Sequence, residues 1–141
     1  MSKRLQRRWA KACERWVHRL WVSDWARDYV VADDLPDKYA TREYQGTMAG
    51  SEIMASYKEA TLILHGKNSA GASDKKLDEL ARHEVLHMVL APYDHTVQDI
   101  IEELPKQKRR PFEKWLESEK EAVVVHLEHA LGLWPSARSG S

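Results

Sequence analysis

The first segment of the chain, at about residues 3–20, has the pattern of an amphipathic helix. Apolar side chains recur at helical spacing and form one stripe: Leu5, Trp9, Cys13, Trp16 and Leu20. Basic side chains occupy the other faces. The pattern predicts a helix that packs on the core and exposes a basic face to solvent.

Short strands are predicted between this helix and residue 66. Residues 28–32 are a β candidate, and residues 33–37 have the composition of a turn. Residues 53–57 and 61–65 are predicted to form the arms of a hairpin, with the turn at residues 57–60. The second arm is rich in β-branched and apolar residues, which favours a buried strand.

A second helix is predicted over residues 74–90, after a small, polar, flexible loop at residues 66–73. Ser73 or Asp74 is a suitable N-cap, and Pro92 is expected to end the helix. The core-facing stripe of this helix is formed by Leu77, Ala81, Val85 and Met88.

The last third of the chain is predicted to be mostly helical. A short helix is expected over residues 97–104, then a basic, proline-bounded loop over residues 105–111, then a helix over residues 112–133. The tail at residues 135–141 is expected to be disordered. With no internal repeat visible, residues 1–134 are expected to form one domain.

Composition agrees with a single small globular domain. A chain of 141 residues with 43% hydrophobic residues can enclose one core, and six tryptophans supply large surfaces for burial. The formal net charge is zero, so the whole chain is not an obvious nucleic-acid binder.

The charge is unevenly distributed, which supports a second interpretation. Residues 1–20 contain seven lysines and arginines against Glu14 alone, and residues 106–110 (KQKRR) add a second basic segment. A nucleic-acid- or partner-binding module could use the basic helix at residues 3–19, with a zinc site that is structural or catalytically inactive. Its stacking groups would be Trp9, Trp16 and Trp21, although their helical spacing is more typical of a core.

A cytoplasmic location without membrane association is the expectation. Cys13 is the single cysteine, so no intramolecular disulfide can form. No apolar run approaches the length of about 20 residues that spans a bilayer. The basic N-terminus lacks the apolar core of a signal peptide.

The strongest chemical signal is the motif His83-Glu84-Val85-Leu86-His87, which spells H-E-x-x-H inside a predicted helix. Two histidines four residues apart project from one helix face, so both imidazoles can reach one zinc ion. Zinc lowers the pKa of a bound water to about 7 and polarises a substrate carbonyl. Glu84 is predicted to be the general base for that water rather than a ligand.

A hydrolytic zinc site needs a third protein ligand. The longer pattern H-E-x-x-H-x-x-G-x-x-H is absent, because Leu90 stands where its glycine would be and Tyr93 where its third histidine would be. A glutamate on the last predicted helix is the alternative. Glu121 opens the apolar stretch at residues 122–125, so its carboxylate is expected to be partly buried and to need a partner such as zinc.

Other candidates for the third ligand and for supporting roles remain open. Glu117 lies one turn before Glu121 on the same face, and the same helix also carries Glu119 and Glu128. His126 or His129 could replace Glu121 as a ligand. One side chain among His126, His129, His95 and Tyr93 could stabilise an oxyanion, although a surface position is more typical of each.

These segments together resemble the minimal gluzincins, small intracellular zinc peptidases common in bacteria and phages, with the SprT-like and ImmA/IrrE-like groups as relatives. The likeness covers about residues 20–132. It rests on residues 55–65 (ASYKEATLILH), 80–90 (LARHEVLHMVL) and 119–128 (EKEAVVVHLE), in the order strand, active helix, third-ligand helix.

The resemblance implies an α+β, zincin-like fold, with a small antiparallel sheet packed on the active helix and with N-terminal and C-terminal helices. The edge strand would border the cleft and could pair with an extended peptide. The resemblance also implies a zinc metallopeptidase that acts on a protein or peptide. Its zinc ligands would be His83, His87 and Glu121, and Glu84 would be its base.

Overall fold

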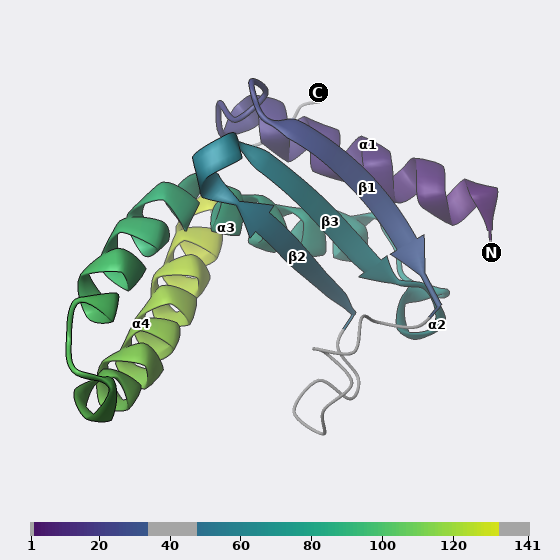
Figure 1. The fold of residues 1–141 in the computed structure, drawn as a ribbon. Helices are drawn as coiled ribbons and strands as arrows, with labels where there is room; N and C mark the ends of the chain where they lie inside the picture. The colour runs from purple at the N-terminus through teal and green to yellow at the C-terminus, as the bar shows by residue number, and fades with distance from the viewer. Residues whose placement is uncertain (1, 34–47, 133–141) are drawn as a thin grey trace.

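The computed structural model describes residues 2–33 and 48–132, so the tail predicted at residues 135–141 and most of the turn predicted at residues 33–37 lie outside it. Over these described residues the protein is α+β, with four α-helices and one small sheet. Figure 1 shows their arrangement. In chain order its elements are α1 (Lys3–Arg19), β1 (Ala26–Ala32), β2 (Ala49–Met54), the 3-10 turn η3 (Ala55–Tyr57), β3 (Glu59–His65), α2 (Gly66–Ser69), α3 (Asp74–Glu102) and α4 (Lys106–Gly132).

The sheet is mixed, so the expectation of an antiparallel sheet is wrong. Its strand order is β1-β3-β2, with β2 antiparallel and β1 parallel to β3. β3 is the central strand and the most apolar of the three, and its Leu62, Ile63 and Leu64 are all buried. β1 and β3 can run parallel because the antiparallel strand β2 lies between them in the sequence. The segment that contains β2 therefore serves as the crossover connection that a parallel pair needs.

The turn before β3 differs from the predicted hairpin. β2 ends at Met54, and the next three residues form η3 instead of continuing the arm predicted over residues 53–57. Lys58 follows with a positive φ of 51°, and its N–H donates to the Ala55 carbonyl. This left-handed residue reverses the chain without the Asn-Gly pair that usually signals a tight hairpin.

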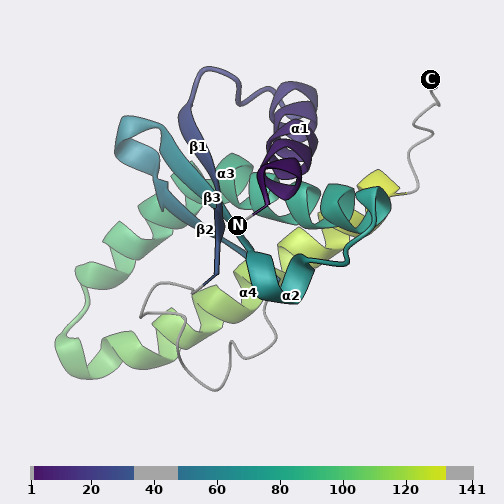
Figure 2. The ribbon, with the colours of Figure 1, turned by 90° about the vertical axis from the view of Figure 1, so that its right-hand side faces the viewer.

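The core lies between the sheet and the pair α1 and α3, which both cover one face of the sheet (Figure 2). The predicted stripe of α1 is confirmed, since Leu5, Trp9, Cys13 and Trp16 are buried and Leu20 packs against them. The Trp9 indole N–H donates to the Leu62 carbonyl at 3.0 Å, which fixes α1 against the central strand. The predicted core stripe of α3 is buried as well: Leu77, Ala81, Val85 and Met88.

Two predicted boundaries in the last third of the chain are wrong. α3 continues through Pro92 to Glu102 and includes most of the separate helix predicted over residues 97–104. α4 begins at Lys106, so most of the loop predicted over residues 105–111 is helical. Earlier in the chain, the loop predicted at residues 66–73 also contains a short helix, α2. Pro92 removes one backbone donor and lies on the exposed side.

The corner between the two long helices is held by Arg109. Its guanidinium donates to the carbonyls of Glu102, the last residue of α3, and Leu104, in the turn that follows. α3 changes direction along its length, so that its second half and α4 project away from the sheet as a helical hairpin (Figure 1). Among the described residues, no helix is long and apolar enough to cross a membrane.

Candidate metal centre

α3 presents both histidines of the motif on one side of its axis. Ser73 caps the helix, its hydroxyl oxygen accepting from the Lys76 N–H at 3.1 Å. The buried stripe then fixes the rotation of the helix against the sheet and α1. His83 and His87 lie off that stripe, with side chains that are 27% and 14% exposed. Their rings are therefore partly shielded but accessible.

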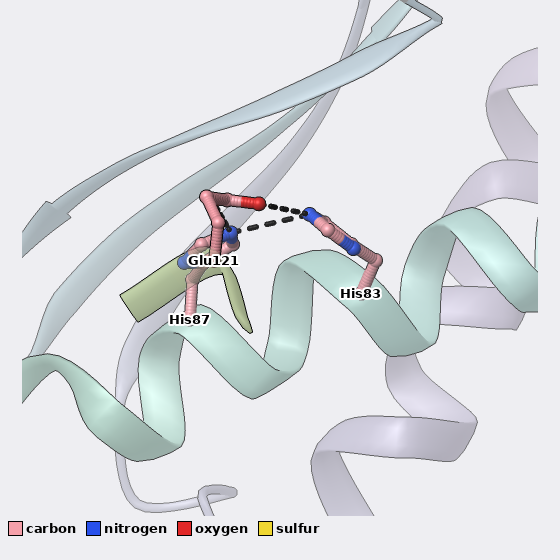
Figure 3. Close-up of side chains that lie close together, drawn as sticks. All are labelled: His83, His87 and Glu121. Carbon is pink, nitrogen blue, oxygen red and sulfur yellow. Dashed lines mark hydrogen bonds and ion pairs between the residues drawn. The ribbon is translucent and has the colours of Figure 1, made fainter. Parts of the chain in front are cut away.

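α4 brings Glu121 to the same place, as Figure 3 shows. One carboxylate oxygen lies 3.1 Å from His87 Nε2 and the other 3.6 Å from His83 Nε2. The two histidine Nε2 atoms are 3.2 Å apart. Three potential ligand atoms from His83, His87 and Glu121 all lie within 4.8 Å of one another.

These distances fit a single small cation. Nitrogen and oxygen ligands held at about 2.0–2.1 Å from a tetrahedral zinc lie about 3.3 Å apart. The two histidine Nε2 atoms are 3.2 Å apart, and two different oxygens of the Glu121 carboxylate lie 3.1 Å from His87 Nε2 and 3.6 Å from His83 Nε2. Two imidazoles and one carboxylate are also a donor set that catalytic zinc uses. The cluster could therefore hold a metal ion.

Glu128 supports the cluster from the next turns of α4. Its carboxylate lies 2.9 Å from His83 Nδ1 and is only 20% exposed. An ionised carboxylate can only accept, so Nδ1–H donates to it, and in the neutral ring the Nε2 lone pair is directed at Glu121. The sequence places Glu128 seven residues after Glu121, on the same face of a helix. That spacing is the available signal for this contact, although the sequence offers Glu128 only as one of the glutamates that could be the third ligand.

Glu84 lies outside the three-residue cluster and is nearly buried, with 6% of its surface exposed. Its carboxylate makes a hydrogen bond with Ser51 on the edge strand β2. Burial raises the pKa of Glu84 to about 7, assisted by the negative charges of Glu121 and Glu128, while His83 and the Ser51 hydrogen bond oppose the rise. A carboxylate with a pKa in this range is suited to exchange protons near neutral pH.

The two histidines have different electrostatic surroundings. Burial lowers the pKa of His83, but the hydrogen bond that its ring donates to Glu128 and the charges of the nearby carboxylates outweigh burial, so the pKa is raised above its ordinary value. Burial lowers the pKa of His87 below its ordinary value, and the positive charge of Lys120 acts in the same direction. His87 is thus favoured in the neutral form that binds metals.

The other predicted candidates lie elsewhere. Glu117 pairs with Lys120 at 3.0 Å, and Glu119 is exposed. His126 and His129 are exposed on α4. Of the residues considered for an oxyanion, Tyr93 is exposed and His95 lies 3.6 Å from Asp99. None of these side chains belongs to the cluster that the described residues form around His83.

The basic helix α1 is partly neutralised by α3. Arg8 pairs with Asp74 at 2.8 Å and Arg15 with Asp78 at 2.7 Å. Two of the three tryptophans considered for base stacking, Trp9 and Trp16, are buried in the core, whereas Trp21 is exposed.

No family model, no curated protein and no solved structure matches this chain significantly. The case for a function therefore rests on the residues and their geometry.

Proposed function

We propose that this chain is a zinc-dependent metallopeptidase, with His83, His87 and Glu121 as zinc ligands and Glu84 as general base. The observation that carries the proposal is the close approach of His83, His87 and Glu121, whose potential ligand atoms lie within 4.8 Å of one another, as three protein ligands of one zinc ion would. The H-E-x-x-H motif on a helix and the buried glutamate beside it agree with the same chemistry.

Zinc, when bound, supplies polarisation of the substrate carbonyl and a more acidic water. The carboxylate of Glu84 takes a proton from the water whose oxygen attacks the carbonyl carbon. As the carbon–nitrogen bond breaks, Glu84 passes that proton to the departing amine, so water is consumed and the base is restored. Glu128 keeps Nε2 of His83 directed at the cluster. Ser51 holds Glu84 from β2.

A peptide substrate is supported by the position of β2. This strand is at the edge of the sheet and packs beside α3, so the side chain of Ser51 reaches the proposed base. An extended peptide that paired with such an edge would lie alongside Glu84 and the histidines. Peptide-bond hydrolysis is therefore favoured over other zinc-dependent hydrolyses.

The direct test is Glu84→Gln, assayed with zinc-loaded protein on a pooled library of quenched fluorescent peptides. We expect the variant to keep one zinc per chain and to lose activity by about 10²- to 10⁴-fold, because the proton acceptor is removed. Full activity of Glu84→Gln would remove the assigned base. If zinc-loaded wild type cleaves no member of the library, the peptidase proposal fails, although the metal centre stands.

The alternative, a nucleic-acid-binding module based on α1, stays a prediction. The pairing of Arg8 and Arg15 with aspartates reduces the charge available on that helix. A steep decrease of affinity for a DNA duplex with rising salt would support it.

A further inference from the structure

The helical hairpin formed by the second half of α3 and the first half of α4 encloses an apolar groove. A cavity of about 550 Å³ lies between the two helices. Its lining is mainly apolar and aromatic and includes Leu90, Val97, Ile101, Phe112, Trp115 and Val123. The groove extends along the hairpin from the metal cluster, since Leu90 and Lys120 line it and neighbour His87 and Glu121 in sequence.

α4 is poorly covered for its length. It has 27 residues, yet within the described part of the chain only Leu116 and Val124 are buried. A helix of a folded protein usually buries a continuous apolar stripe. Here Trp115 is 63% exposed, and Phe112 and Val123 on the same helix are exposed as well. Ile100 on α3, also 63% exposed, extends the apolar surface to the facing helix. Such a contiguous surface is typical of an interaction site.

The charges of α4 indicate which partner covers this surface. The first part of the helix, residues 106–114, has five basic residues and one acid, whereas residues 115–128 have four glutamates and one lysine, and two of these glutamates, Glu117 and Glu119, lie outside the metal cluster and its contact with His83. Lys108 and Glu119 continue the apolar stripe of Phe112, Trp115 and Val123 at helical spacing. Two copies of α4 that run antiparallel about a two-fold axis near Trp115 would place each basic half against an acidic half.

We propose that this chain forms a two-fold symmetric homodimer through the α3–α4 hairpins, with α4 of each copy antiparallel to its equivalent. The two hairpins then make a four-helix layer that covers the apolar groove of each copy. This inference does not depend on the proposed peptidase activity, because it uses the apolar and charged surface of the hairpin and not the metal ligands.

The first test measures the solution mass of the full-length protein by light scattering and sedimentation at about 1 to 100 μM. We expect twice the chain mass of 16.4 kDa for wild type. Trp115→Glu should give the monomer mass with an unchanged helical content by circular dichroism. Tyr57→Glu, which alters an exposed aromatic residue outside the hairpin, should remain a dimer. A wild type that is monomeric throughout this range overturns the proposal.

The second test is a charge exchange that isolates the antiparallel arrangement. Lys108→Glu with Lys114→Glu removes the net positive charge of residues 106–114, and Glu117→Lys with Glu119→Lys reverses the net negative charge of residues 115–128. We expect each double variant alone to dimerise at least about tenfold more weakly than wild type, and an equimolar mixture to form the heterodimer. Failure of the mixture to associate overturns the antiparallel pairing. If wild type is a monomer and Trp115→Glu instead loses peptide cleavage, the groove binds substrate and the dimer proposal is rejected.

Discussion

The hydrogen bond between Glu128 and His83 determines which nitrogen of His83 faces Glu121. Without the Glu128 carboxylate, the His83 ring is free to rotate and must be ordered when zinc binds. Glu128→Ala should therefore weaken zinc binding by about 10- to 100-fold. Glu128→Gln retains an acceptor oxygen and should weaken it less. Competition titration with a chromogenic chelator measures both. Glu119→Ala, an exposed position on the same helix, is the matched control, and an unchanged affinity of Glu128→Ala would refute the supporting role.

A second residue-scale prediction concerns Glu14, whose carboxylate accepts two hydrogen bonds from Arg27, at 2.5 and 3.0 Å, and one from Tyr29. The Arg27 hydrogen bonds lower the pKa of Glu14 from 4.5 to about 2, assisted by Tyr29 and opposed by burial. A lowered pKa means that ionised Glu14 stabilises the folded state above pH 4.5, and that this contribution is lost as the pH falls towards 2.

Glu14→Gln should therefore lower the free energy of unfolding at pH 7. The difference from wild type should disappear as the pH falls towards 2. The Glu14 side chain is 38% exposed, so solvent screening limits the contribution to about 1 kcal/mol. Urea unfolding of both proteins between pH 7 and pH 2 measures it, with the exposed Glu113→Gln as control. A stability difference that stayed constant across this range would contradict the assignment.

At the scale of elements, the sequence predicts best where the apolar pattern is local and uninterrupted. α1 was expected over residues 3–20 and is observed over Lys3–Arg19, since its stripe is regular and packs as the pattern requires. The prediction that Pro92 ends α3 is wrong, because burial of Ala91 and Ile101 offsets the loss of one backbone hydrogen bond. The parallel pairing of β1 with β3 depends on distant contacts that no local pattern records.

The two long helices are expected to depend on the metal for their mutual position. α4 buries only Leu116 and Val124 among its described residues, and the ligands of the proposed site join α3 to α4. The comparison starts from protein in which the free zinc concentration is about 100 times the dissociation constant for zinc. Removal of the zinc with EDTA should then lower the hydrogen-exchange protection of α4 by up to about 100-fold. Amides of α1 and of the first half of α3 should change little. Equal protection of α4 with and without zinc would show that the metal does not hold the helices together.

At the scale of the whole molecule, the site combines a local part and a distant part. The H-E-x-x-H spacing is local, so His83 and His87 could be placed on one face from the sequence alone. The choice of Glu121 over Glu117 depends on where α4 crosses α3, and the sequence offered only its apolar neighbours as a guide. The role of Glu128 follows from the same crossing and could be recognised only after it was known.

The central claim is tested most directly by the zinc content and affinity of the purified protein, measured for wild type, Glu121→Ala and Glu117→Ala. We predict one zinc per chain for wild type and for Glu117→Ala. We predict a loss of zinc from Glu121→Ala, because a tetrahedral site with two protein ligands binds it far more weakly. A wild type that binds no zinc, or a Glu121→Ala variant that binds it as tightly as wild type, would contradict the account.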